Sequence, residues 1–167
     1  MFQCHRAGRL LIRSFLMMSW LLIFNTSAGA QVSVVVSRKA NVDSSKINEV
    51  DIKRIFSGAQ LKWDDGGKIQ VIDQSETSVG KVFYKKVLKQ SKNQMQRRWA
   101  RLRFSGKAGA LTKVKSDKQV KQIVSRNHYA IGYILTSALD ESVKEIFRLK
   151  SPNRTIEARK IENHAGK

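Results

Sequence analysis

The sequence predicts an α/β domain in which a mostly parallel sheet is flanked by helices. Short β-branched or alternating runs, which are typical of strands, occur along the chain in alternation with segments whose apolar residues recur at helical spacing. Residues 31–167 are enough for one ordinary domain, and the sequence contains no internal repeat and no second domain.

Residues 1–30 are typical of a cleaved secretory signal. A positively charged leader is formed by Arg6, Arg9 and Arg13. The apolar run "FLMMSWLLIF" that follows is too short to span a bilayer comfortably. Small residues at Ala28 and Ala30 suit a signal peptidase, so we expect cleavage after Ala30, a periplasmic location and no membrane span in the mature chain. An uncleaved N-terminal anchor is the alternative.

The chain is strongly basic, with 32 Lys and Arg against 13 Asp and Glu and a formal net charge of +19. The leader contributes three arginines and no acids, so the mature chain remains positive and favours anionic partners. Nucleic acid is not expected as a partner of an exported protein. Small oxyanions, lipopolysaccharide, acidic polymers and acidic proteins are the partner classes that remain.

The first half of the mature chain predicts a strand, a helix and a second strand. "VSVVV" over 32–36 is a β-branched run of the kind found in buried strands. "NEVDIKRIFSG" predicts a short helix that Asn48 caps, with Asp51 three residues on and Gly58 in the left-handed position after the last turn. "WDDGG" predicts a turn, and the alternating run "KIQVID" predicts the second strand over 68–73.

Three helices are predicted next. The first is expected from about 79 to 89 and the second from about 93 to 102, where the apolar residues form one stripe. A glycine-containing loop follows, and Ser116 with Gln119 forms a capping-box pattern that begins the third helix.

The last two predicted strands are "YAIGYIL" over 129–135 and "VKEIFRL" over 143–149. The domain is therefore expected over 31–150. The remaining residues, 151–167, are charged and lack periodicity, which predicts a flexible basic tail.

The loop "DQSETS" over 73–78 is rich in side-chain oxygens and lies between a predicted strand and a predicted helix. In α/β sheets, ligands bind beyond the carboxyl ends of the strands and against helix starts. Ser75, Thr77 and Ser78 therefore suit an oxyanion held by hydroxyls and by the first N–H groups of the helix. Hydroxyls at the same place also cap helices, and the sequence leaves both interpretations open.

The segment "KNQMQRRWARLRF" interleaves arginines with Trp99 and Phe104. One interpretation is a nucleic-acid site in which bases stack on Trp99. We favour the alternative, in which Met95, Trp99 and Leu102 share an inward helix face and the arginines are solvated.

Neither metal binding nor catalysis is indicated. Asp64 and Asp65 are followed by two glycines, a pattern typical of a turn. No metal-ligand spacing joins the histidines, which are His5, His128 and His164. The only cysteine, Cys4, lies in the leader, and no nucleophile has a credible base. We therefore expect a non-enzyme that uses no cofactor and no metal.

The order of motifs resembles a known family. "IFSG" is followed by "WDDG", a strand, the loop over 73–78, "KVFYKKVL", "RRWARLRFSG" and "AIGYI". This order is similar to the phosphate-binding component of phosphate ABC transporters, a type 2 periplasmic binding protein, and most of all to short, single-domain members of that superfamily. The resemblance covers residues 32–135. It implies a single lobe of a fold whose full-length members close two lobes on a ligand.

The resemblance also implies a ligand site. Full-length members carry Asp-Gly-Ser-Gly-Thr-Arg before the Val-Phe pair of this helix. Aligned on that pair, Thr77 keeps a hydroxyl and Ser75 replaces the acid. Gly80 replaces the arginine, and a lysine one place on does not reproduce its planar fork of donors. The implied ligand-binding residues are Ser75, Thr77, Ser78 and Lys81. We expect weakened oxyanion binding. If the old site survives, a Gly80→Arg change should raise phosphate affinity, and no change would mean that the loop is only a helix cap.

Two functions follow as expectations. The first is an exported, phosphate-binding-protein-like solute-binding domain with a weakened site, linked to phosphate ABC transport or sensing through a permease or another envelope protein. The alternative is a non-catalytic envelope interaction module that has lost ligand binding and docks an acidic partner through its basic surface.

Overall fold

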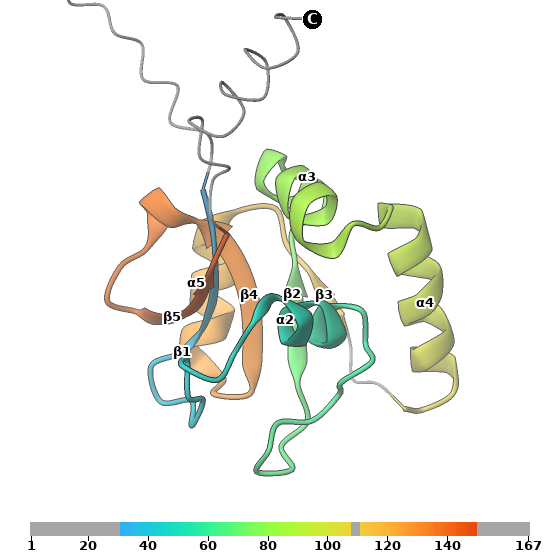
Figure 1. The fold of residues 1–167 in the computed structure, drawn as a ribbon, viewed down its shortest axis with the longest axis horizontal. Coiled ribbons are helices and arrows are strands. Elements are labelled where there is room, and N and C mark those ends of the chain that lie inside the picture. The colour runs from blue at the N-terminus through green and yellow to red at the C-terminus, as the bar shows by residue number, and fades with distance from the viewer. Residues whose placement is uncertain (1–30, 108–110, 150–167) are drawn as a thin grey trace, which may run out of the picture.

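The computed structural model describes residues 31–107 and 111–149, and five strands in these segments form one sheet. Their order across the sheet is β3 (Thr112–Lys113), β2 (Gln70–Asp73), β4 (Ala130–Leu135), β1 (Val32–Ser37) and β5 (Val143–Arg148). β2 is parallel to β3 and β4, whereas β1 is antiparallel to β4 and β5. Of the five strands, β1 alone is reversed, so the predicted mostly parallel sheet is confirmed (Figure 1).

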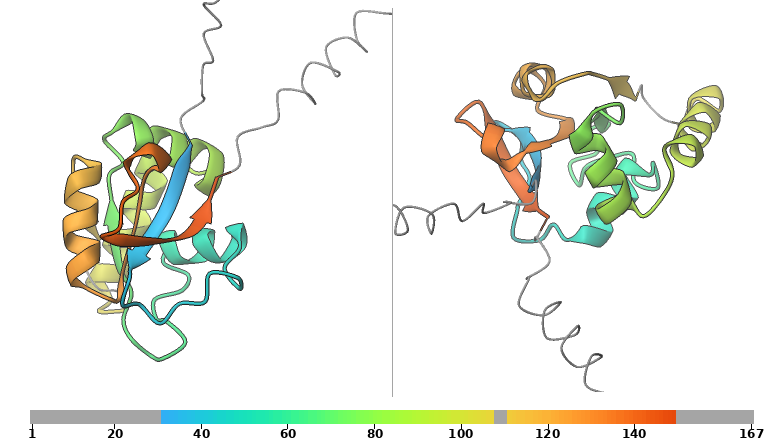
Figure 2. Two further views of the ribbon diagram at one scale, coloured as in Figure 1. Left: turned by 90° about the vertical axis from the view of Figure 1, so that its left-hand side faces the viewer. Right: turned by 90° about the horizontal axis from the view of Figure 1, so that it is seen from above.

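Helices cover both faces of this sheet (Figures 1 and 2). In chain order the helical elements are α2 (Glu49–Phe56), α3 (Ser78–Phe83), the π-helix η2 (Tyr84–Leu88), α4 (Lys92–Phe104), α5 (Asp117–Arg126) and the 3-10 turn η3 (Thr136–Ala138). α2, α3 and η2 bury their apolar side chains in the larger core cluster together with Val34 and Val36 of β1. α5 packs on the other face in a second cluster, which contains Val35 of β1. β1 is therefore apolar on both faces, as its continuous β-branched run predicts.

The predicted start and end of α2 are confirmed. The Asn48 side chain accepts hydrogen bonds from the N–H groups of Val50 and Asp51, and Asp51 accepts one from the Asn48 N–H at 3.0 Å. Gly58 follows the helix with φ of 72°, a conformation that costs glycine little because it has no Cβ.

At the start of α5, only half of the predicted capping box is formed. Ser116 caps the helix by accepting a hydrogen bond from the Gln119 N–H at 3.3 Å. The Gln119 side chain accepts from the N–H of Lys115 at 2.8 Å, one residue before the position that a reciprocal capping box requires. The cap is therefore formed from one side only.

Three elements were not foreseen: the π-helix η2, the short strand β3 and the 3-10 turn η3. The helix predicted to reach residue 89 changes into the π-helix η2 after Phe83, and Lys89 ends it in a left-handed conformation with φ of 52°. β3 lies in a region predicted as loop, because two residues carry no periodicity that could reveal a strand. It is recognised only by its pairing with Ile72 and Asp73 of β2.

The predictions for 1–30 and 151–167 lie outside the described residues. Among the helices of the described segments, none combines the length and apolar character needed to cross a membrane.

Candidate functional site

The carboxyl ends of β2, β3 and β4 lie at the same end of the sheet because these three strands are parallel. We call this end the carboxyl edge. The oxygen-rich loop leaves β2 at this edge and leads into α3, and the chain after β3 leads from the same edge into α5. This is the position at which open α/β sheets bind ligands, so the edge is the candidate functional site.

Gln74 ties the loop to the rest of this edge. Its side-chain amide donates to the Tyr133 carbonyl at 2.6 Å and to Asp117 Oδ1 at 2.7 Å. Its backbone N–H donates to the Tyr133 hydroxyl at 3.1 Å, and Asp117 Oδ2 accepts from the Leu135 N–H. The loop is therefore held against β4 and the start of α5 by buried hydrogen bonds. Sequence reasoning placed Gln74 in the loop without assigning it this role.

The hydroxyls at the helix start divide between two environments. Thr77 Oγ1 accepts from the Gly80 N–H at 3.1 Å and donates to the Gln74 carbonyl at 2.9 Å, so Thr77 is the N-cap of α3. Ser78 is exposed at the first position of α3, whereas Ser75 is only 6% exposed. The three predicted hydroxyls therefore do not converge on one open position. The capping interpretation is confirmed for Thr77.

Gly80 is packed directly against the loop. A Cβ added at this position would lie 2.2 Å from the Gln74 carbonyl oxygen and 2.6 Å from Ser75 Cα. Backbone atoms cannot rotate away as a flexible side chain can. A Gly80→Arg change would therefore displace the loop instead of adding an arginine to an intact site.

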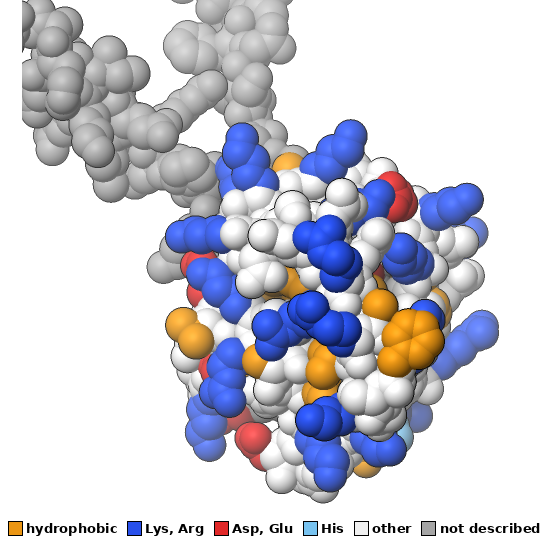
Figure 3. All heavy atoms as spheres, turned by 90° about the vertical axis from the view of Figure 1, so that its right-hand side faces the viewer, with side chains coloured by type: hydrophobic (Ala, Val, Ile, Leu, Met, Phe, Trp, Pro, Cys, Tyr) orange, Lys and Arg blue, Asp and Glu red, His pale blue; other side chains and the backbone are white. Residues whose placement is uncertain are grey.

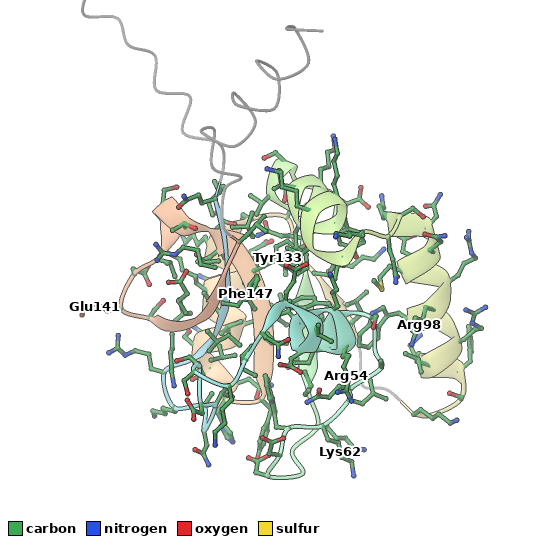
Figure 4. The ribbon with its side chains drawn as sticks, in the orientation of Figure 1. Arg54, Lys62, Arg98, Tyr133, Glu141 and Phe147 are labelled. Atoms are coloured by element: carbon green, nitrogen blue, oxygen red, sulfur yellow. The ribbon has the colours of Figure 1, made fainter. Side chains whose placement is uncertain are left out.

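A buried carboxylate lies behind the loop. Asp73 is buried, and its Oδ1 accepts a hydrogen bond from the Tyr133 hydroxyl at 2.7 Å. Tyr133, which is labelled in Figure 4, is fully buried. Burial raises the pKa of the Tyr133 hydroxyl, and the Asp73 carboxylate raises it further; the same two causes raise the pKa of Tyr84. Both tyrosine hydroxyls are therefore protonated at physiological pH.

The charges of three lysines act on Glu76 at the tip of the loop. Glu76 is exposed and forms an ion pair with Lys92 at the start of α4. The hydrogen bond from Lys92 lowers the pKa of the Glu76 carboxyl, and the charges of Lys92, Lys113 and Lys81 lower it further. Lys81, Lys92 and Lys113 come from α3, α4 and β3, and we refer to them as the lysine cluster. Only Lys81 was predicted as a ligand-binding residue. Lys92 and Lys113 were missed because they are far from the loop in sequence and only the fold brings them near it.

The predicted core position of Trp99 is confirmed. Trp99 is 4% exposed, and its indole Nε1–H donates to the Phe56 carbonyl at 2.8 Å. Its ring is therefore unavailable for stacking on nucleic-acid bases. The arginines of α4 are exposed, as expected.

The predicted turn at Asp64 and Asp65 is also confirmed. Asp65 Oδ1 accepts from the Gly67 N–H at 2.9 Å, and Gly66 has φ of 84°. Across residues 31–107 and 111–149, no three His, Cys, Asp or Glu side chains are grouped as a metal site requires.

Sheet topology and helix placement define one lobe of a periplasmic-binding-protein-like fold. Solved structures with this fold include an ABC-type phosphate transport receptor from Vibrio cholerae, with 19% identity and a TM-score of 0.54 over 70% of this chain and 46% of that one. A putative phosphate ABC transporter substrate-binding protein with bound phosphate from Clostridium perfringens matches with 20% identity and a TM-score of 0.53. The match covers 70% of this chain and 44% of that one. PstS from Borrelia burgdorferi matches with 16% identity and a TM-score of 0.51, and the match covers 78% of this chain and 53% of that one.

The resemblance found in the sequence is therefore confirmed at the level of the fold. The chain spans about half the length of the structures that it matches. No protein-family model matches the chain, and no curated protein matches it either.

Proposed function

We propose that the chain is an exported, non-enzymatic solute-binding lobe that binds phosphate or another small oxyanion weakly, in the setting of phosphate transport or sensing. The observation that supports this most is the lysine cluster: Lys92 pairs with Glu76 of the loop, Lys113 lies beside Asp73, and all three charges act on Glu76. Phosphate is the ligand named for a solved structure that shares the fold, and a group of cations attracts such an anion.

Weak binding follows from the geometry of the site. The three cations are long, solvent-accessible side chains, and an exposed ion pair contributes about 0.2–1 kcal/mol. Thr77 is engaged as the helix cap, Ser75 is buried, and Gly80 leaves no room for a fixed arginine. Glu76 also competes for the lysines as a resident carboxylate. We expect a millimolar dissociation constant that rises with salt.

The proposal is tested by titrating inorganic phosphate into the full chain while recording amide NMR spectra. A Glu76→Gln variant removes the competing carboxylate, so its phosphate affinity should rise about 2–5-fold. Replacing Lys81, Lys92 and Lys113 together by alanine should abolish the phosphate-dependent shifts of the loop amides.

A matched control removes the same charge elsewhere. Lys39, Lys62 and Lys68 are exposed and lie towards the opposite edge of the sheet, and Figure 4 shows Lys62 far from α3. Their alanine variant should retain phosphate binding. Equal losses in both triple variants would show that net charge alone attracts phosphate. If neither the wild type nor Glu76→Gln shows shifts of the loop amides, the oxyanion proposal is wrong.

Export is tested separately. Expression of the full chain in a Gram-negative host, followed by mass spectrometry of the periplasmic fraction, should find a mature protein that begins at Gln31. Recovery of the intact chain only in the membrane fraction would indicate the uncleaved anchor instead.

A further inference from the structure

One side of α4 is left uncovered by the fold. Met95 and Trp99 point into the core and are almost fully buried. Arg97, Arg101 and Phe104 follow one another at spacings of four and three residues, which places them together on the opposite side of the helix. All three are exposed, and Phe104 is 85% exposed. We call Arg97, Arg101 and Phe104 the α4 face.

The arginine charge on α4 is not neutralised locally. The helix contains four arginines and no acidic residue: Arg97, Arg98, Arg101 and Arg103. Within the part of the chain that the structure describes, none of these four forms a salt bridge. The α4 side of the molecule carries many Lys and Arg side chains and few acids (Figure 3). An anionic partner would therefore meet little competition from the protein itself.

The exposed Phe104 ring favours a partner that offers an apolar layer in addition to negative charge. The Arg103 guanidinium lies 5.7 Å from the centre of the Phe104 ring, so the apolar side chain sits among cations. A surface that fits both features has many phosphates at adjustable positions and an apolar layer at shallow depth. Anionic phospholipid membranes have this structure: their headgroups attract basic side chains, and an apolar side chain can enter the boundary between headgroups and acyl chains.

We propose that the α4 face docks the protein on an anionic lipid surface. Phe104 enters the boundary between headgroups and acyl chains, and Arg97 and Arg101 bind headgroup phosphates. This inference does not rest on oxyanion binding, because no residue of the α4 face belongs to the lysine cluster.

Other anionic partners fit α4 less well. A protein partner commonly buries about 800 Å² of each surface around aromatic anchors, whereas the α4 face offers one large apolar side chain. A single-stranded nucleic acid stacks successive bases on several aromatic rings, and Trp99, the other aromatic residue of α4 besides Phe104, is buried. The observations therefore favour a lipid surface.

The experiment measures co-sedimentation of the full chain with vesicles of equal parts phosphatidylglycerol and phosphatidylcholine, and with phosphatidylcholine vesicles. The test variant is Arg97→Gln/Arg101→Gln/Phe104→Ser. The matched control, Lys118→Gln/Arg126→Gln/Val50→Ser, removes the same charge and one exposed apolar side chain from α5 and α2; Val50 is 62% exposed. The N-terminal segment is identical in all three proteins, so it contributes equally to each measurement.

The wild type should bind the anionic vesicles and not the neutral ones. Loss of two arginines near the surface should weaken binding about 30-fold, and the control should lose far less. In a Phe104→Trp variant, anionic vesicles should shift the tryptophan emission to shorter wavelength by more than in the wild type, whose Trp20, Trp63 and Trp99 give the background signal.

Three results would overturn the proposal. Equal losses in the test variant and the control would show attraction by net charge without a preferred face. Absence of an emission shift at position 104 would show that Phe104 does not enter the bilayer. If polyglutamate or a single-stranded oligonucleotide binds through the α4 face while vesicles do not, the face serves a soluble polyanion instead.

Discussion

Gly80→Ala sets two physical effects against each other in one substitution. Alanine is favoured over glycine within a helix by about 0.5–1 kcal/mol, so the change would stabilise a helix with free space at this position. In this fold the new Cβ would meet the backbone of Gln74 and Ser75 at 2.2 and 2.6 Å. The sign of the stability change therefore reports whether the loop is packed against α3.

The magnitude follows from what must move. The Cβ would be about 1 Å too close to the Gln74 carbonyl oxygen for ordinary van der Waals contact. That oxygen also accepts from the Thr77 N–H and the Thr77 hydroxyl, each at 2.9 Å. Overpacking commonly costs about 1–3 kcal/mol, and loss of a helix cap adds about 1 kcal/mol. After the preference for alanine is subtracted, we expect a net loss of about 1–3 kcal/mol.

The assay is urea denaturation followed by far-UV circular dichroism. Ser78→Ala, at an exposed position in the same turn, is the control and should change the free energy of unfolding by less than about 0.5 kcal/mol. A Gly80→Ala protein as stable as the wild type, or more stable, would refute the packing argument. Gly80→Arg should destabilise at least as much and should not tighten phosphate binding.

Three further changes test other parts of the fold. Thr77→Ala removes the cap of α3 and should cost about 1 kcal/mol in urea denaturation, most of which Thr77→Ser should restore. Trp99→Phe leaves the Phe56 carbonyl without its donor and should cost about 1–3 kcal/mol; a neutral result would contradict the buried hydrogen bond. The hydrogen bond from Arg148 lowers the pKa of Glu145 below its usual 4.5. The ion pair therefore stabilises the fold fully above pH 4.5, and this stabilisation is lost as the pH falls through the lowered pKa of Glu145. Denaturation curves between about pH 3 and pH 7 should therefore show an acid loss of stability that Glu145→Gln reduces, and an unchanged pH profile would exclude this role.

Much of the secondary structure was predictable because it depends on neighbours in the sequence. The cap of α2 needs only Asn48 and the residues two and three places on. β1 follows from a continuous β-branched run, and the turn at Asp65 follows from a side chain that bonds two residues ahead. The resemblance to phosphate-binding proteins came from the same local motifs in order, and it correctly predicted the fold.

The state of the candidate site was decided by tertiary structure. Gln74 reaches partners 43 and 59 residues away, and the lysine cluster is assembled from three elements. An alignment could show that Gly80 stands where an arginine is expected, but only the packed loop shows that no side chain fits there. The sequence alone determined an oxygen-rich helix start, because helix caps are made within one turn. Whether its hydroxyls face a ligand or the protein interior depends on contacts between distant segments, and those contacts close the loop and leave Glu76 among the lysines.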